Sequence, residues 1–237
     1  MKPHEVRVDR SSRPAKIAFA ETFNVTVPFL DRHLEAGRGG RVLARWPEPD
    51  GGSGEITWAE TAEKACRFAS ALVRLGVTAG DRVMLFAKDG PAFYIGFLGA
   101  MRIGAVAIPV NYFLRAADYA YMLKDSGACV ALASNAVFDE LDPALASAGG
   151  SVRHRIAIEG PRRGWLALDD VLASGAPFVP PAETTPATDA FWLYSSGSTG
   201  SPKASVHQHK DQVWTSVLYA EDVIGIASGT VTGNVLN

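Results

Sequence analysis

Short apolar runs alternate with amphipathic stretches along most of this chain, and the alternation predicts its secondary structure. The apolar runs have the length of buried strands and lie at residues 83–87, 105–110, 128–133 and 155–158. The stretches between and before them have helical spacing, at residues 57–75, from 89–91 onward, at 116–125 and at 137–148. Strand–helix repetition of this kind predicts an α/β fold with a mainly parallel sheet flanked by helices.

Local signals place the start of two helices. Thr57 and Glu60 have the spacing of a capping box, so we expect a helix to begin just after Thr57. Pro91 suits the first turn of the next helix, with Asp89 or Gly90 as its cap.

The remaining segments predict the organisation of the chain. Residues 1–20 are polar and basic with little periodicity, and we expect them to form a loose N-terminal arm, with 21–237 as one domain. The Pro- and Gly-rich run 47–54 predicts a tip between two strands. Residues 173–188 are predicted to form a surface connection, and residues 208–223 a helix.

Composition narrows the class of protein. The chain has 237 residues, of which 47% are hydrophobic and 20% charged, with a formal net charge of −2. That charge gives no general attraction to DNA or RNA, so we expect no nucleic-acid partner. No apolar run approaches the ~18 residues of a membrane span, and residues 1–7 lack the apolar core of a signal peptide. The expected location is therefore the cytoplasm.

Few residues suggest a metal or a disulfide. Cys66 and Cys129 both lie among apolar neighbours, which is typical of small core residues in a reducing compartment. His207 and His209 are two positions apart and could share a strand face, but they lack a third ligand nearby. We therefore predict no metal site and assign the two histidines a role either in packing or in support of the residues that contact the nucleotide.

Residues 194–203 carry the strongest chemical signal, with the sequence Tyr-Ser-Ser-Gly-Ser-Thr-Gly-Ser-Pro-Lys. The glycines can adopt backbone angles that point successive N–H groups into one concavity, and the hydroxyls and the lysine add further donors. Apolar residues 191–194 predict a strand before this loop, and residues 203–207 predict a strand after it. The candidate phosphate-binding residues are Ser195, Ser196, Gly197, Ser198, Thr199, Gly200 and Lys203.

A flexible linker and a Walker-type loop both fit these residues less well. A Ser/Gly linker would not normally abut an aromatic-rich strand and end in Pro-Lys. A Walker-type loop needs Gly before its lysine, Ser or Thr after it, and a helix next. Here Pro202 and Ala204 flank Lys203 and a strand pattern follows, which excludes the Walker loop.

The loop resembles the signature loop of the acyl-adenylate-forming enzymes, which include acyl-CoA synthetases, peptide-synthetase adenylation domains and luciferases. Residues 56–60, 80–83 and 98–111 resemble other core segments of that family in the expected order. Residues 23–25, 31–34 and 118–123 look most like those of benzoate–CoA ligases. Ala204 stands where the family usually has Gly, and a positive φ or a very close backbone approach there would strain the loop by roughly 1 kcal/mol or more.

This resemblance implies that residues 21–237 are part of an N-terminal AMP-binding domain of an acid–thiol ligase. Such enzymes join a carboxylic acid, here an aromatic one, to ATP as an acyl-adenylate and then to CoA as a thioester, with Mg²⁺ as cofactor. The loop would hold the β- and γ-phosphates of ATP. The resemblance places the Tyr-Gly-x-Thr-Glu stretch, a ribose-binding acid and a small C-terminal domain downstream.

No counterpart of those downstream parts is found in the sequence, so the resemblance yields no complete catalytic set. We therefore expect an incomplete domain that is inactive alone and that exposes apolar surface and unpaired strand edges. The alternative hypothesis is a non-catalytic fragment that binds phosphate or another protein. The sequence does not determine the oligomeric state or the acid.

Overall fold

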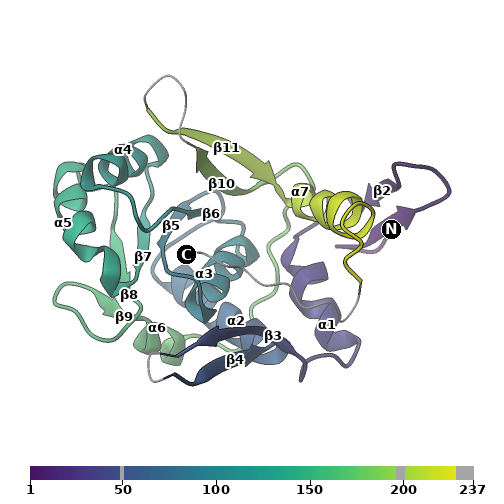
Figure 1. Ribbon diagram of the computed structural model, residues 1–237, viewed down its shortest axis with the longest axis horizontal. Helices are drawn as coiled ribbons and strands as arrows, with labels where there is room; N and C mark the ends of the chain where they lie inside the picture. The colour runs from purple at the N-terminus through teal and green to yellow at the C-terminus, as the bar shows by residue number, and fades with distance from the viewer. Residues whose placement is uncertain (49–50, 196–200, 228–237) are drawn as a thin grey trace.

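A seven-stranded sheet organises the molecule in the computed structural model, which describes residues 1–48, 51–195 and 201–227 (Figure 1). The strand order is β11-β10-β6-β5-β7-β8-β9, and every neighbouring pair is parallel except β10 with β11. The strands are β5 (Arg82–Phe86), β6 (Val106–Pro109), β7 (Val130–Ala133), β8 (His154–Ala157), β9 (Leu166–Ala167), β10 (Asp189–Ser195) and β11 (Lys203–Gln208). The predicted α/β class is confirmed.

Helices cover both faces of the sheet. Helices α2 and α3 pack on one face, and α4 and α5 pack on the other (Figure 1). The helices are α1 (Arg32–Glu35), α2 (Trp58–Arg74), α3 (Pro91–Arg102), α4 (Ala116–Ser126), α5 (Phe138–Ser147), α6 (Leu168–Ser174) and α7 (His209–Trp214), with π-helical turns η1 (Val27–Asp31) and η3 (Thr215–Glu221) and the 3₁₀ turn η2 (Asn135–Val137). None of the helices in the described ranges is long and apolar enough to cross a membrane.

Strand β5 shows why the buried positions of the central strands are apolar on both faces of the sheet. Val83 and Leu85 point to the core beneath α2 and α3, whereas Met84 and Phe86 point to the core beneath α4. Successive side chains of a strand alternate between faces, so a strand covered on both sides needs apolar residues throughout. The predicted strand at 83–87 follows directly from this requirement.

The predicted helix starts are confirmed. The Thr57 hydroxyl accepts a hydrogen bond from the backbone N–H of Glu60 (3.2 Å), and the Glu60 carboxylate accepts one from the Thr57 N–H (2.8 Å). This reciprocal pair satisfies backbone donors that the first turn of α2 leaves free. Gly90 caps α3, and Pro91 is its first residue.

The first 20 residues differ from the expected loose arm. They contain an antiparallel hairpin of β1 (Val6–Asp9) and β2 (Lys16–Phe19), and its apolar side chains pack on the α2–α3 core. Alternation over only four residues per strand is too short to stand out in a polar sequence. The tip predicted at 47–54 does join two strands, β3 (Val42–Pro47) and β4 (Ser53–Thr57).

The connection at 173–188 is also less superficial than expected. Its first two residues belong to α6, and Thr184 is buried. The Thr184 hydroxyl donates to the Phe23 carbonyl (2.7 Å), and the Thr184 carbonyl accepts from the Phe23 N–H (2.7 Å). These paired bonds attach the connection to the segment before η1.

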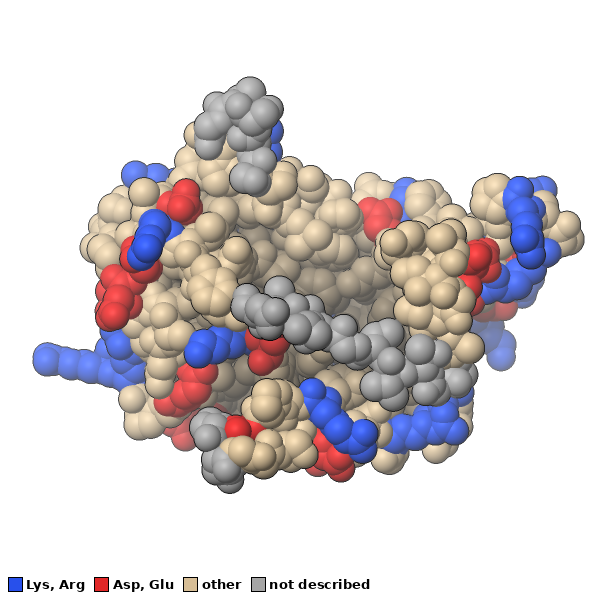
Figure 2. Space-filling view, viewed as in Figure 1, with Lys and Arg blue, Asp and Glu red and all other residues tan. Residues whose placement is uncertain are grey.

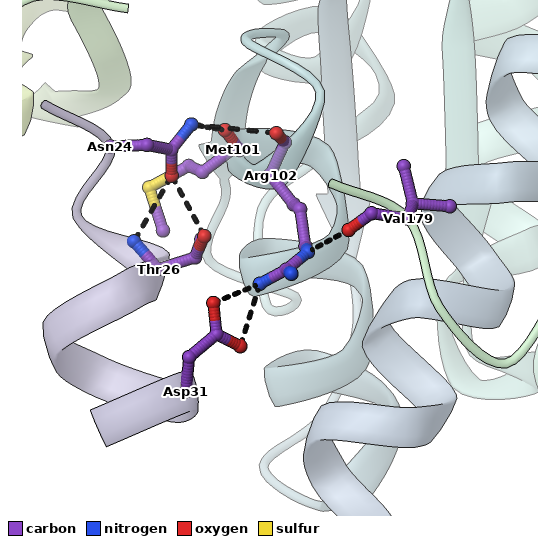
Figure 3. Close-up of polar contacts among 6 residues, drawn as sticks. All are labelled: Asn24, Thr26, Asp31, Met101, Arg102 and Val179. Carbon is purple, nitrogen blue, oxygen red and sulfur yellow. Dashed lines mark hydrogen bonds and ion pairs between the residues drawn. The ribbon is translucent and has the colours of Figure 1, made fainter. Parts of the chain in front are cut away.

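A buried polar network holds the N-terminal segment against the end of α3 (Figure 3). Arg102 is fully buried, and its Nη1 lies 3.0 Å from both carboxylate oxygens of Asp31. Its Nε donates to the Val179 carbonyl at 2.6 Å. The Asn24 amide donates to the Met101 carbonyl at 3.0 Å and accepts from Thr26. Three distant chain segments therefore meet at one charged side chain.

Candidate functional site

The hairpin of β10 and β11 presents the two ends of the candidate phosphate loop. Ser195 and Lys203 are paired directly across the two strands, and both are exposed. The strands predicted on either side of the loop are thereby confirmed. Of the candidate loop residues, Ser196, Gly197, Ser198, Thr199 and Gly200 lie outside the described residues.

The sheet topology sets the position of this hairpin. Phe191 of β10 is in parallel register with Ala107 of β6, so Ser195 lies at the carboxyl end of β10. Ligands of open α/β sheets bind beyond the carboxyl ends of the strands. The arrangement places one hydroxyl and one ammonium group at that edge, a suitable pair for an anionic ligand.

Ala204 meets no conformational difficulty at its position. It lies in β11 opposite Tyr194, and His4 is the one non-glycine residue with positive φ among those described. The family's usual glycine is therefore not needed for backbone conformation at this point, and strain from a positive φ does not arise.

Tyr194 ties the hairpin to helix α4. Its hydroxyl donates to the Asp125 carboxylate at 2.6 Å. Burial, followed by the hydrogen bond and charge of Asp125, raises the pKa of Tyr194, so the phenol stays protonated as a donor. This bond fixes the strand that leads into the loop.

A row of aromatic rings supports the face of the hairpin that is turned toward α3, opposite the face that Tyr194 ties to α4. The ring of His207 stacks on Phe191 with centroids 4.5 Å apart and planes at 4°, and Phe191 meets Phe97 of α3 edge to face. These contacts add to the area that the rings bury. His207 therefore packs against β10, which is one of the two roles that its sequence suggested.

His209 lies apart from His207, at the first position of α7, and is fully buried. Its Nδ1 accepts a hydrogen bond from the Val25 N–H at 3.2 Å. Burial lowers the pKa of His209 to about 4, so the imidazole is neutral at pH 7. Across the part of the chain that the structure describes, no three His, Cys, Asp or Glu side chains gather as metal ligands.

Apolar side chains are exposed around this hairpin, as expected. Leu193 and Val206 project from its strands at 41% and 48% exposure, and Tyr219 and Ile224 are exposed beyond α7. Figure 2 shows one face of the molecule. The middle of that face carries few charged residues, and the lysines, arginines and acids lie mainly toward its rim.

Sequence reasoning missed the residues that brace the hairpin from other elements. Asp125 is 69 positions from Tyr194, and Phe97 is 94 positions from Phe191. In the sequence, Asp125 is only a polar residue near a helix end. The order of the strands brings it beneath β10, and no local pattern in the sequence encodes that order.

Comparison with known proteins relates the chain to one family. Residues 32–232 match the family described as AMP-binding enzyme. The chain is 39% identical to a benzoate–CoA ligase of Thauera aromatica over 224 residues, which cover 94% of this chain and 41% of that protein. It is 37% identical to a 3-hydroxybenzoate–CoA ligase of Aromatoleum sp. strain CIB, over 70% of this chain and 32% of the relative.

Solved structures agree with this relation. A benzoate CoA ligase from Burkholderia xenovorans LB400 aligns with a TM-score of 0.74 and 36% identity, over 86% of this chain and 38% of that one. The anthranilate CoA ligase AuaEII, solved with anthranoyl-AMP, aligns with a TM-score of 0.81 and 27% identity, over 88% and 39%. The chain thus spans about two fifths of the length of these proteins.

Proposed function

This chain belongs to the AMP-binding enzyme family, and from that membership we propose that it holds the ATP phosphates in an aromatic acid–CoA ligase. The observation that carries the proposal is the cross-strand pairing of Ser195 with Lys203 at the carboxyl end of β10. The choice of an aromatic acid rests on the relatives, whose names specify benzoate or hydroxybenzoate.

The proposed reaction has two steps. A carboxylate oxygen of the acid attacks the α-phosphorus of ATP, the bond to the β-phosphate breaks, and pyrophosphate leaves. The thiol of CoA then attacks the acyl carbon, and AMP leaves with the bonding electrons. The first step moves negative charge onto the departing phosphates, so fixed donors that meet that charge lower its barrier.

Lys203 is the residue to which we assign this stabilisation. Its ammonium is exposed, and Ser195 opposite it adds a hydroxyl donor. The hydrogen bond of Tyr194 to Asp125 fixes the strand end, so the donors are positioned before the nucleotide arrives. We assign no magnesium ligand to the described residues, because they provide no cluster of carboxylates for one.

A chimera tests the proposal. This chain would replace the matching 41% of the Thauera aromatica benzoate–CoA ligase, and benzoate-dependent exchange of pyrophosphate into ATP would be measured. We expect exchange from the chimera and none above background from this chain alone, since it spans only about two fifths of that relative. A folded chimera without exchange, or robust exchange by the chain alone, would contradict these expectations.

Lys203→Ala in the chimera is expected to slow exchange by about one to two orders of magnitude, since a lost charged hydrogen bond costs about 1.5–3 kcal/mol. Lys124→Ala is the matched control, because Lys124 is exposed on α4. Equal rates for the two variants would remove the role given to Lys203.

A further inference from the structure

Two histidines that are far apart in the sequence accept hydrogen bonds from neighbouring backbone N–H groups. The Nδ1 of His4 accepts from the Asn24 N–H at 3.0 Å, and the Nδ1 of His209 accepts from the Val25 N–H at 3.2 Å. The N-terminal segment and the start of α7 therefore hold the same stretch of backbone, just before η1. We call this pair of hydrogen bonds the histidine clasp.

The clasp lies where the β1–β2 hairpin meets α7 (Figure 1). Phe19 of β2 contacts Trp214 of α7, with ring centroids 6.4 Å apart. Arg10, between β1 and β2, forms ion pairs with Glu221 and Asp222 at the end of η3, and all three side chains are largely exposed. Exposed ion pairs contribute little to stability, so the clasp and the apolar contacts hold the hairpin in place.

Both bonds require an unprotonated Nδ1. The donors are backbone N–H groups, so each imidazole is the neutral tautomer that carries its proton on Nε2. A protonated imidazole is a donor at both nitrogens and cannot accept, so protonation of either ring breaks its bond. Protonation of His209 would also place a charge on a fully buried side chain, which is unfavourable.

The surroundings of the two rings oppose protonation while the hairpin is attached. Burial is the largest effect on His4 and lowers its pKa, and the charge of Arg102 lowers it further. The carboxylates of Asp31 and Glu183 act in the opposite direction. Burial, and then the charge of His4, lower the pKa of His209 to about 4.

The backbone of His4 adds to the cost of breaking its bond. Its φ is 60°, and it is the one non-glycine residue with positive φ among those described. Such a conformation is uncommon for a residue with a Cβ and is kept only where other contacts hold it. The His4 N–H donates to the Thr22 carbonyl at 2.8 Å, so loss of the ring bond leaves that single bond to hold the conformation.

We propose that the histidine clasp makes the attachment of residues 1–20 to α7 sensitive to pH, and that acid releases this segment while the sheet stays folded. Release exposes both rings to water, so the released form binds protons that the attached form excludes. With a pKa of about 4 when attached and 6.5 when released, His209 alone raises the ratio of released to attached forms about thirtyfold between pH 7.5 and pH 5. This release does not depend on the function proposed for Lys203.

Hydrogen–deuterium exchange of the unaltered chain at pH 7.5 and pH 5, corrected for the intrinsic exchange rates, tests the proposal. We expect the protection of amides in β1 and β2 to fall about tenfold or more at pH 5, because an isolated two-stranded hairpin is only marginally stable. It should also lie at least about tenfold below the protection of α2, which opens only with the whole domain. Equal protection of the hairpin and α2 at pH 5, or equal protection of the hairpin at both pH values, would overturn the proposal.

Variants that keep the acceptor but do not titrate identify the source of the effect. In the double variant His4→Asn with His209→Asn, each amide oxygen can accept the same backbone bond, so hairpin protection should be nearly equal at the two pH values. His154→Asn, on β8 and away from the hairpin, is the matched control and should keep the native pH dependence. The double variant leaves Arg10, Glu221 and Asp222 in place, so a native pH dependence in it would overturn the role of the clasp.

Titration of the histidine rings by NMR decides the matter on the unaltered chain even if the double variant does not fold. The chain has five histidines, and the single variants His4→Asn and His154→Asn assign signals of partly exposed rings. We expect the rings of His4 and His209 to titrate below pH 6.5. Titration of either ring at or above pH 6.5 would overturn the proposal.

Discussion

Asp31→Asn removes the charge that opposes a fully buried arginine and keeps nearly the same shape. In the native protein the Arg102 side chain has no solvent exposure, whereas that of Asp31 is 25% exposed. The asparagine keeps one oxygen that can accept from Arg102 Nη1 but carries no negative charge. The variant therefore leaves the guanidinium with only neutral acceptors, chiefly the Val179 carbonyl.

The expected cost is about 3 kcal/mol of unfolding free energy. Removing the charge of one partner of a buried ion pair costs about 3–5 kcal/mol, because the charge of the other partner stays desolvated. The lower end applies here because water already reaches part of the Asp31 carboxylate. The Nη2 of Arg102 is unpaired among the described residues, so the network has no spare acceptor to take over. The nearby Phe178 ring, 5.6 Å from the guanidinium carbon, offers a weak contact at most.

Urea unfolding at pH 7, followed by circular dichroism, measures the loss as a lower midpoint at unchanged slope. The matched control is Glu55→Gln, which removes the charge from an exposed pair with Arg45 and should change stability by no more than about 0.5 kcal/mol. The double variant Arg102→Met with Asp31→Leu should be more stable than Asp31→Asn alone, because no unpaired charge remains. If Asp31→Asn matches its control, or if the double variant is the least stable, the reasoning about the buried charge is wrong.

Two further predictions concern stability. His209 has a native pKa of about 4 against 6.5 when unfolded, so between these values the unfolded chain binds the extra proton. Stability should therefore be greatest above pH 6.5 and fall by up to about 3 kcal/mol as the pH drops toward 4. Urea midpoints at pH 7 and pH 5 check this, and an equal pH dependence in His209→Gln would exclude His209 as its source. Gly175→Ala would place a Cβ 2.0 Å from the Arg67 carbonyl oxygen between α2 and α6 and should cost about 2 kcal/mol or more, whereas Gly40→Ala meets nothing within 4 Å and should be tolerated. Thermal melts that rank the two alanine variants equally would contradict the close approach at Gly175.

The sequence is sufficient where the deciding interaction is local. Thr57 and Glu60 are three positions apart, so their capping box can be recognised without knowledge of the fold. The strand at 83–87 follows from the apolar residues that two covered faces require. The two strands that flank the phosphate loop are predictable because the apolar run before it and the alternation after it are both short-range patterns.

Only the tertiary structure determines the contacts between residues that are far apart in the sequence. The sheet places β10 beside β6 and β5 beside β7, so strands that are neighbours in space are not always neighbours in sequence. That order sets Asp125 against Tyr194. Arg102 finds Asp31 across 71 positions in the same way. Periodicity shows that a residue is buried, but its partner depends on how distant elements pack, which short-range patterns do not contain.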